Sequence, residues 1–438
     1  MIVAALAGAL VAMGLLRVAA RPRITVAVRS TPVGQVVELV GGEAGLGDLA
    51  EVLAGQGHDD ILRRRSGDGW VLASTLIVEP GAELHVGGNL RLVSEPGQII
   101  GLEARGGRLD VRDATVSSWD RRTGRPDPDP DDGRSWVLAR DRATMDVLDA
   151  RMVELGYDWP ERYGVVWRTA GTGGEVRGSS FTGNWHGAWT AGTAPMRIRD
   201  SVFARSHVHG LDPSGGSRGF VIEDNEFSGN GRNGLILAVE CDQAVVKGNR
   251  AFGNKGHGIV IQQRSDDVLV EANEVHDNGL AGIDVSGSAR ARLAANVVYA
   301  NWTGVTVHDG AADISLERNR LTANRVDGMR VSTGGAVRTM RANLVDQNYR
   351  AGAYLDGGTA QLGPGNRLIG NEVGLWIGGR ARRASVTGNT IAGNVLDGVH
   401  LEQGAGPVEL RSNAIRSNGK AAFPVERVEG QPLDGFSR

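Results

Sequence analysis

The chain has 438 residues, a formal net charge of −3 and a single cysteine, Cys241. Because 48 Lys and Arg nearly balance 51 Asp and Glu, without a long basic run, the charge argues against a nucleic-acid-binding protein, and one cysteine excludes an intrachain disulfide framework or a CxxC metal site. The 65 glycines and only 5% aromatic residues predict many tight turns around a thin core, unlike a compact α/β enzyme.

The N-terminal segment predicts export from the cytoplasm. Residues 2–16 are uncharged and almost wholly apolar, which is short for a membrane span and suits the core of a signal peptide. Small residues for cleavage follow at 18–20, although the usual preceding positive charge is missing. We therefore expect residues 1–20 to be a signal peptide or an N-terminal membrane anchor, and the protein to be periplasmic, secreted or anchored on the outer side of the membrane.

The next stretch, residues 21–75, is expected to form a capping region. Leu46, Leu49, Val52 and Leu53 have the spacing of an apolar helix face, and a helix is a suitable cover for exposed strand edges. From residue 76 onward, short runs of alternating apolar residues predict strands with irregular turns. Residues 121–134 are rich in Pro and Asp and predict a projecting loop.

A glycine repeat decides the architecture of the rest of the chain. From Gly164, a glycine recurs every 22 to 24 residues. After Gly210, each glycine is followed by an apolar, variable, apolar triplet, so that the first and third residues of each triplet share one face. The later repeat glycines are Gly187, Gly210, Gly234, Gly258, Gly282, Gly304, Gly328, Gly352, Gly374 and Gly398.

Two asparagines follow in each repeat from Gly210 onward, the first 14 or 15 residues after the glycine and the second five residues later. Identical residues at a coil-length period are expected to stack, to hydrogen-bond along the axis and to serve tight turns through left-handed backbone conformations. The two series are Asn225, Asn249, Asn273, Asn296, Asn319, Asn343, Asn366, Asn389 and Asn413, and Asn230, Asn254, Asn278, Asn301, Asn324, Asn348, Asn371, Asn394 and Asn418.

These patterns predict an all-β fold, a right-handed parallel β-helix of about 11–13 coils of 22–24 residues with a small N-terminal cap region. The solenoid is expected to cover residues 76–420, and residues 421–438 to form a C-terminal cap or tail. A leucine-rich repeat has a similar period but needs a helix or several leucines in each unit, which this sequence lacks.

The second residue after each glycine should point outward from the same sheet. Aromatic rings there suit stacking on pyranose rings, and polar groups suit sugar hydroxyls or carboxylates. The alternative is a sheet face covered by neighbouring loops. This column reads Trp189, Asp212, Ile236, Val260, Asp284, Thr306, Arg330, Tyr354, Trp376 and His400.

The residue just before each glycine gives a second column, in which His186, His209 and His257 lie within four coils, near Asp212. We interpret this group as a candidate site for proton chemistry. Metal binding is the weaker reading, because the coil spacing does not place three imidazoles around one ion, and no metal or cofactor is predicted. Other charged residues should line the flanks of the same groove and hold an anionic polymer: Arg232, Glu240, Lys255, Arg264, His308 and Asp309.

The segment 207–215, His-Val-His-Gly-Leu-Asp-Pro-Ser-Gly, with Gly219-Phe-Val-Ile-Glu-Asp-Asn225 and His257-Gly-Ile-Val-Ile261, resembles the single-domain periplasmic mannuronan C5-epimerases. The resemblance spans residues 76–355. It departs from that family's Asp-Pro-His-Asp signature, which reads Asp212-Pro213-Ser214-Gly215 in this chain. An expected arginine in the next coil is Val239, while the following Glu240 is retained.

The resemblance implies a β-helix that inverts C5 of uronate residues within a polymer and needs no redox cofactor. His209 or His207 would then act as base or acid, His257 as a second proton carrier, Asp212 as the group contacting the uronate carboxylate, and Arg232 as the charge neutraliser. The substrate-binding set would be Trp189, His186, Glu240, Arg264, Asp284, His308, Arg330 and Tyr354.

Two other functions stay open at this point. A polysaccharide lyase would begin with the same proton abstraction, and a carbohydrate-binding β-helix would keep the groove without the chemistry. In each case the expected partner is an extended anionic or neutral polysaccharide, with no nucleic acid, and the protein is expected to be a monomer with possible membrane attachment through its N-terminal segment.

Overall fold

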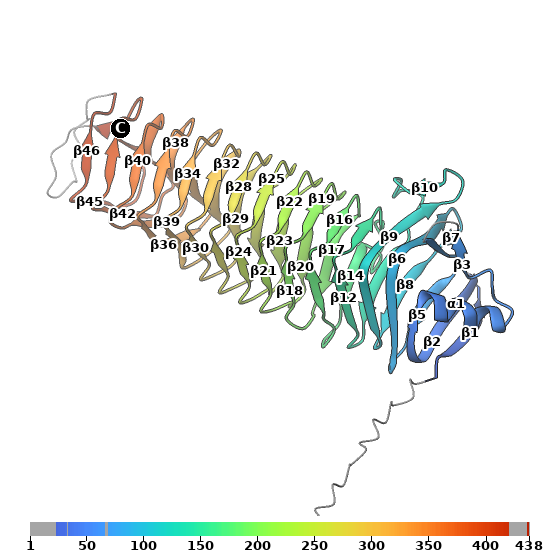
Figure 1. The fold of residues 1–438 in the computed structure, drawn as a ribbon. Helices are drawn as coiled ribbons and strands as arrows, with labels where there is room; N and C mark the ends of the chain where they lie inside the picture. The colour runs from blue at the N-terminus through green and yellow to red at the C-terminus, as the bar shows by residue number, and fades with distance from the viewer. Residues whose placement is uncertain (1–22, 33, 66–68, 420–435, 438) are drawn as a thin grey trace, which may run out of the picture.

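The structure, a computed structural model, describes residues 23–32, 34–65, 69–419 and 436–437. The chain winds into a long solenoid with its N-terminal elements at one end and its C-terminal strands at the other (Figure 1). The predicted signal peptide or anchor at 1–20, and most of the predicted tail at 421–438, lie outside the described residues. No helix within the described residues is long and apolar enough to span a membrane.

Each regular coil contributes three strands, and each strand pairs in parallel with its counterparts in the adjacent coils. The first ladder contains β5 Thr75–Val78, β8 Gly101–Arg105, β11 Trp136–Arg140, β14 Gly164–Arg168, β17 His186–Ala191, β20 Leu211–Ser214, β23 Leu235–Ala238, β26 Ile259–Gln262, β29 Ala281–Ser286, β32 Thr303–His308, β35 Met329–Ser332, β38 Ala351–Asp356, β41 Val373–Ile377, β44 Val399–Leu401 and β47 Phe436–Ser437.

The second ladder contains β12 Thr144–Leu148, β15 Glu175–Arg177, β18 Arg197–Arg199, β21 Val221–Glu223, β24 Val245–Lys247, β27 Leu269–Glu271, β30 Arg292–Ala294, β33 Ile314–Glu317, β36 Ala336–Arg341, β39 Thr359–Leu362, β42 Arg383–Thr387 and β45 Val408–Arg411. The third contains β13 Arg151–Val153, β16 Ser180–Thr182, β19 Val202–Ala204, β22 Glu226–Ser228, β25 Arg250–Phe252, β28 Glu274–His276, β31 Val297–Tyr299, β34 Arg320–Thr322, β37 Leu344–Asp346, β40 Arg367–Ile369, β43 Thr390–Ala392 and β46 Ala414–Arg416.

The N-terminal end is built from longer strands and one helix. These elements are β1 Thr25–Thr31, β2 Gly34–Gly45, α1 Leu46–Gly55, β3 Leu62–Arg65, β4 Gly69–Leu72, β6 Ala82–Glu95, β7 Gln98–Ile99, β9 Arg108–Asp120 and β10 Arg125–Pro126. Strand β9 pairs with both β12 and β13, so it spans the second and third ladders. Strand β10 folds back on β9 within the predicted projecting loop, as Figure 1 shows.

The all-β solenoid is therefore confirmed, with about 14 turns. The count exceeds the expected 11–13 because β5, β8 and β11 add three coils before the first repeat glycine, Gly164. The predicted helix is also present as α1, which buries Leu46, Leu49 and Leu53. The apolar spacing of this helix could be recognised in the sequence. The first coils are irregular and lack the repeat glycine, so they could not be counted from the sequence.

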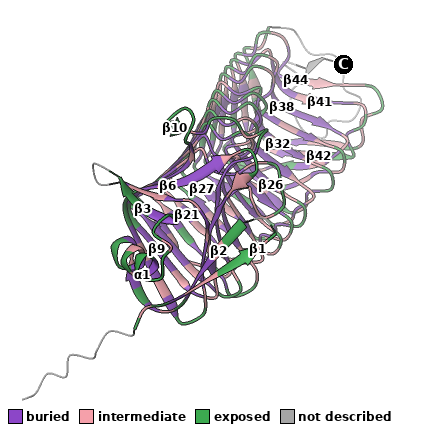
Figure 2. Cartoon of the chain, turned by 90° about the vertical axis from the view of Figure 1, so that its right-hand side faces the viewer, coloured by how far each residue is buried: buried purple, intermediate pink, exposed green. Residues whose placement is uncertain are grey.

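The core is a thin stack of identical inward positions. Figure 2 shows buried strands and more exposed turns along the rod. Leu235, Ile259, Ile283 and Val305 pair in register from coil to coil and are fully buried, as the triplet pattern predicts. In the third ladder, the rings of Phe181 and Phe203 stack with centroids 4.6 Å apart.

Two asparagine ladders run along the rod. Asn254, for example, donates through Nδ2 to Asn278 Oδ1 at 2.9 Å, and its backbone N–H donates to the same oxygen at 3.2 Å. The expected stacking is thus confirmed, but the expected left-handed asparagines are wrong. The positive φ angle falls instead on the residue before each asparagine, such as Asp277 before Asn278 and Ala295 before Asn296. The asparagine side chain then points into the rod and forms hydrogen bonds with backbone groups of adjacent coils.

Apart from Gly164, which has a positive φ angle, the repeat glycines are required by close approach rather than by backbone angle. A Cβ on Gly258 would lie 2.4 Å from Val275 Cγ1 and 2.7 Å from the carbonyl oxygen of Gly282, the equivalent glycine of the next coil. Since real Cβ atoms do not approach carbonyl oxygens this closely, any side chain at this position would push adjacent coils apart. This contact explains the glycine period in the sequence.

Candidate functional site

The outer face of the first ladder carries the predicted outward column in register. Trp189 pairs with Asp212, Val260 with Asp284, and Tyr354 with Trp376. The same register joins Asp284 to Thr306, Thr306 to Arg330 and Trp376 to His400. Side chains separated by more than 200 residues in the sequence therefore share one face of the rod.

The column before each glycine is also continuous. Backbone hydrogen bonds link the glycine after His186 to His209, the glycine after His209 to Asn233, and the glycine after Asn233 to His257. Tyr163, just before Gly164, begins the same series, because the N–H of His186 donates to its carbonyl. This tyrosine was missed by the sequence reasoning, although extending the column by one coil would have found it.

Five side chains from these two columns gather at one place. The ring of His186 lies 5.3 Å from the rings of both Tyr163 and His209, measured between centroids. Its Nδ1 lies 3.4 Å from Oδ2 of Asp212. Trp189 packs edge-on against Tyr163 at 5.4 Å. An aromatic wall thus borders a histidine and carboxylate pair.

The polar atoms of this pair are buried but unsatisfied. Nδ1 of His186 and Oδ1 of Asp212 are both inaccessible to solvent and have no hydrogen-bond partner. Such atoms are uncommon in folded proteins because each lost hydrogen bond to water costs about 1–3 kcal/mol. The shortest approach within the pair is the 3.4 Å between His186 Nδ1 and Asp212 Oδ2, an arrangement in which a carboxylate can orient an imidazole.

The other two histidines of the column are fixed in one tautomer by backbone hydrogen bonds. The N–H of Asn233 donates to Nδ1 of His209, and the N–H of Ala281 donates to Nδ1 of His257, each at 3.2 Å. In the neutral ring, the proton must then sit on Nε2. Burial, with the nearby His186 and Arg232, lowers the pKa of His209 to about 3, so that it is neutral at physiological pH. Burial also lowers the pKa of His257.

A second polar group lies further along the same face. His308 Nε2 contacts Asp284 Oδ1 at 2.9 Å, and its Nδ1 contacts Asp309 Oδ2 at 2.9 Å. Thr306 also donates to Asp284. The hydrogen bond to Asp284 raises the pKa of His308 to about 8, so this imidazole carries a proton at neutral pH. Both of its nitrogens are engaged, which assigns it to holding the local structure.

The remaining predicted residues are spread along the rod. Arg330 and Arg350 lie over the ring of Tyr354 at 5.2 and 4.5 Å. Arg264 pairs with Glu240 at 2.7 Å in an exposed turn. The structure therefore brings His186, His209, Asp212 and Trp189 together, and does not bring them together with Glu240, Arg264, Asp284, His308, Arg330 or Tyr354.

Two predicted catalytic residues lie at the rim beside the cluster. His207 is exposed and stacks on Trp185 with ring centroids 5.7 Å apart. Arg232 is also exposed, and its charge acts on His209. Ser214 is the last residue of β20 and pairs with Ala191 of the preceding coil. It occupies the position of the histidine in the Asp-Pro-His-Asp signature, so that histidine is missing from this site.

Comparison with known proteins agrees with this architecture. The family model described as "Right handed beta helix region" matches residues 163–321 and 310–427. The mannuronan C5-epimerase of Pseudomonas putida is 27% identical over 282 residues, 60% of this chain and 49% of that protein. The corresponding enzyme of Pseudomonas syringae pv. tomato is 25% identical over 54% of this chain and 41% of its own length. The chain thus spans about half the length of these curated relatives.

Among solved structures, the periplasmic alginate epimerase AlgG has a similar fold. It superimposes with a TM-score of 0.65 and 19% identity over 92% of this chain and 96% of that chain. A double mutant of the same epimerase gives a TM-score of 0.67 at 18% identity, over 92% of this chain and 95% of that chain. On the match to the family model, which covers more than half of its length, the chain belongs to the right-handed β-helix family.

Proposed function

We propose that this protein is a polysaccharide C5-epimerase that inverts uronate residues within a polymer lying along the outer face of the first ladder. The observation that carries the proposal is the buried pair of His186 and Asp212, whose Nδ1 and Oδ2 lie 3.4 Å apart, beside Tyr163 and His209. The names of the curated relatives support the same activity. The protein acts as a monomer outside the cytoplasm, free or attached through its N-terminal segment, and takes no redox cofactor.

C5 inversion requires a base close to C5 and hydrogen-bond donors or positive charge around the adjacent carboxylate. The base removes the C5 proton, and the C–H electron pair moves into the adjacent carboxylate as an enolate-like charge. A proton then returns to C5 from the opposite face, so that no atom is gained or lost overall. Hydrogen-bond donors aimed at the developing charge lower the barrier of the first step.

In this assignment, His186 is the proton acceptor and Asp212 is the residue that orients it. Asp212 lies against Nδ1, which leaves Nε2 available to the substrate, as in other carboxylate and histidine pairs. His209 presents Nε2–H to the uronate carboxylate, and Arg232 at the rim supplies positive charge. His209 is thus a donor rather than the base, because its Nδ1 already accepts the N–H of Asn233.

Proton return is assigned to solvent. Strands β20 and β23 end at Ser214 and Ala238, at equivalent positions of adjacent coils, and neither side chain is a proton carrier at neutral pH. His257 lies two coils beyond His209, about 10 Å away at the usual strand spacing, and contacts a neighbouring sugar residue instead.

NMR of polyuronates in heavy water tests the proposal. We expect solvent deuterium at C5 in chains of unchanged length. His186→Gln should reduce the exchange rate by at least about 100-fold, the usual contribution of a general base, and Asp212→Asn should reduce it by a smaller factor. The matched control is His276→Gln, because His276 stacks between Phe252 and Tyr299 in the third ladder.

Three results would contradict the proposal in different ways. Unsaturated chain ends would identify a lyase that expels the C4 oxygen after the same first step. Binding without exchange would identify a carbohydrate-binding protein. Exchange that is unchanged in His186→Gln would remove the His186 and Asp212 pair from the mechanism.

A further inference from the structure

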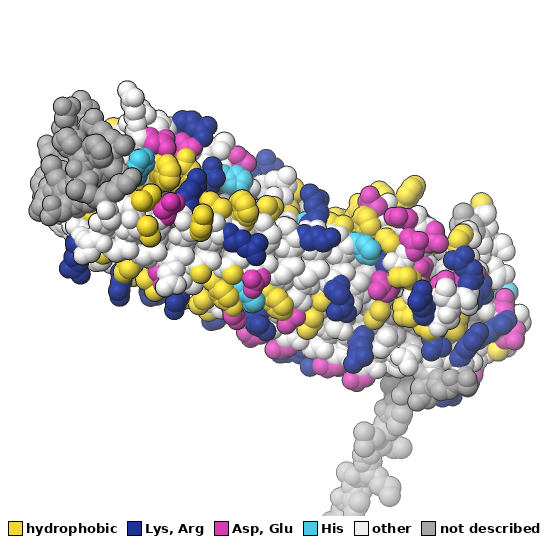
Figure 3. All heavy atoms as spheres, turned by 90° about the horizontal axis from the view of Figure 1, so that it is seen from above, with side chains coloured by type: hydrophobic (Ala, Val, Ile, Leu, Met, Phe, Trp, Pro, Cys, Tyr) yellow, Lys and Arg dark blue, Asp and Glu magenta, His cyan; other side chains and the backbone are white. Residues whose placement is uncertain are grey.

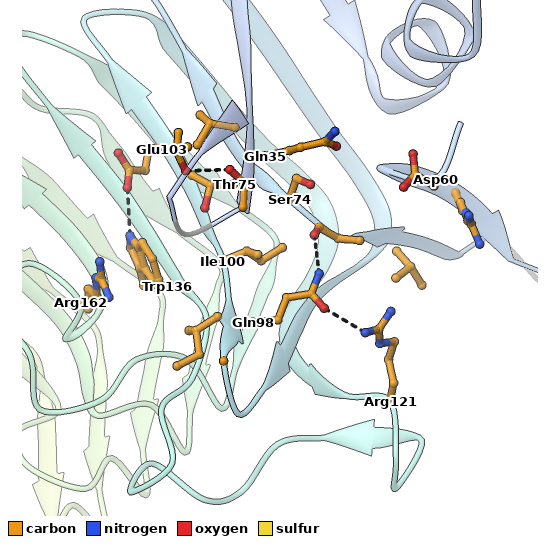
Figure 4. Close-up of a pocket in the computed structure, with 18 of the residues that line it drawn as sticks. Gln35, Asp60, Ser74, Thr75, Gln98, Ile100, Glu103, Arg121, Trp136 and Arg162 are labelled. Carbon is orange, nitrogen blue, oxygen red and sulfur yellow. Dashed lines mark hydrogen bonds between the residues drawn. The ribbon is translucent and has the colours of Figure 1, made fainter. Parts of the chain in front are cut away.

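A hollow of about 720 Å³ lies at the N-terminal end of the same rod. It opens over β5, β8 and β11, and its labelled lining residues include Trp136, Glu103, Thr75 and Gln98 (Figure 4). None of these residues was singled out by the sequence reasoning, because they precede the regular glycine repeat. The proposed chemistry does not use the hollow.

The hollow lies on the same strand ladder as the proposed site. Glu103 pairs with Leu138, Leu138 with Val166, Val166 with Trp189, and Trp189 with Asp212. These four coil steps correspond to about 19 Å at the usual strand spacing. Trp136, Leu138 and Val166 form one apolar cluster, against which Tyr163 and Trp189 pack. Leu138 and Val166 are buried beneath Tyr157 and Tyr163, so a polymer that joins the site to the hollow runs over the segment of residues 157–163 and not on the strands themselves.

The lining suits an anionic sugar residue in shape and charge. Trp136 donates through Nε1 to Glu103 at 3.2 Å, and the guanidinium of Arg162 lies 4.2 Å from the centroid of the Trp136 ring. Gln98 is anchored by its Nε2 to the carbonyl of Ala73 at 2.9 Å. Indole, amide and guanidinium groups of this kind contact the faces, hydroxyls and carboxylates of sugars.

Positive charge predominates in the hollow. Four arginines, at 63, 65, 121 and 162, face two acidic residues, Asp60 and Glu103. Arg121 is already held by Glu95, but among the described residues neither Arg63 nor Arg65 has a carboxylate within ion-pair distance. Burial raises the pKa of Glu103. By contrast, charges of both signs are interspersed along the face of the rod in Figure 3.

We propose that this hollow is a distal subsite that binds uronate carboxylates of the same polymer, several sugar residues away from the one that reacts. This inference rests on the proposed function for the identity of the polymer. It makes the affinity depend on chain length: oligomers of about ten residues reach from the His186 and Asp212 pair into the hollow, whereas trimers do not.

Isothermal titration calorimetry with oligouronates of defined length tests this inference. We expect the double substitution Arg63→Gln and Arg65→Gln to weaken binding of the ten-residue oligomer about tenfold or more and to reduce its salt dependence. Binding of the trimer should be unchanged. The matched control is Arg338→Gln with Arg383→Gln, which removes two arginines from a separate hollow over the second ladder.

A second measurement uses the unaltered protein. Hydrogen exchange of residues 97–103 should slow on addition of the ten-residue oligomer and not of the trimer. Equal affinity of both double variants for the long oligomer, or equal protection by both oligomers, would overturn the subsite. If affinity does not depend on oligomer length while C5 exchange is normal, the subsite alone is rejected. If binding depends on length but no C5 exchange occurs, only the epimerase activity is rejected.

Discussion

Substituting Asn278 by Ala tests how much one rung of the asparagine ladder stabilises the fold. Asn278 is fully buried. Its Oδ1 accepts the backbone N–H and the Nδ2 group of Asn254, and its own Nδ2 donates to the carbonyl of Ala251 at 3.0 Å and to Asn301 Oδ1 at 2.9 Å. Alanine leaves the N–H of Asn254 and the carbonyl of Ala251 buried without these partners.

Each orphaned buried group costs about 1–3 kcal/mol, so we expect the free energy of unfolding to fall by about 3–5 kcal/mol. Equilibrium urea unfolding followed by circular dichroism measures this change. Hydrogen exchange should show the loss concentrated in the coils around residues 251–301, because each coil contacts mainly its neighbours. The exposed Gln361→Ala serves as a control. A loss below about 1 kcal/mol would refute the view that the ladder satisfies otherwise unpaired backbone groups.

Three further predictions follow from single positions. Gly258→Ala should destabilise the rod by about 2–4 kcal/mol in the same urea assay, since its Cβ would lie 2.7 Å from a carbonyl oxygen of the next coil, whereas Gly41→Ala, with nothing within 4 Å, should change it by less than about 1 kcal/mol. The pKa of His308, about 8 beside Asp284, lies above its ordinary unfolded value of about 6.5. The stabilising contribution of His308, up to about 2 kcal/mol, is therefore complete below pH 6.5 and is lost as the pH rises through 8. His308→Gln should flatten this decline in stability, and an NMR titration of His308 should give the same pKa. The buried Cys241, whose pKa is raised to about 12 by burial, should resist thiol reagents in the native protein and react on unfolding; rapid native labelling would contradict its placement.

The sequence was sufficient for the repeated part of the fold because its constraints are periodic. Glycine marks the close approach of adjacent coils and asparagine marks the ladders, so both recur at the coil length. The left-handed positions were not readable in the same way, because residues as different as Asp277, Ala295 and Arg318 occupy them. There, the conformation is imposed by the asparagine that follows rather than by the residue itself.

The candidate site was less predictable. The coil register brought His186, His209 and Asp212 together on sequence evidence alone, since equal offsets from the repeat glycine share a column. The roles within the column depend on hydrogen bonds that have no sequence signal, such as the one from Asn233 to His209. The N-terminal hollow was missed because its residues lie on coils of irregular length, where no offset can be counted.

The uniform ladder rungs also bear on how such a protein changes in length. Asn225, Asn249 and Asn273 make the same hydrogen bonds to their successors, so excising residues 249–272 would place an identical acceptor opposite Asn225. Whole coils are thus interchangeable at the ladders, and duplication or loss of one coil in evolution would lengthen or shorten the polymer track while the reacting centre stayed intact.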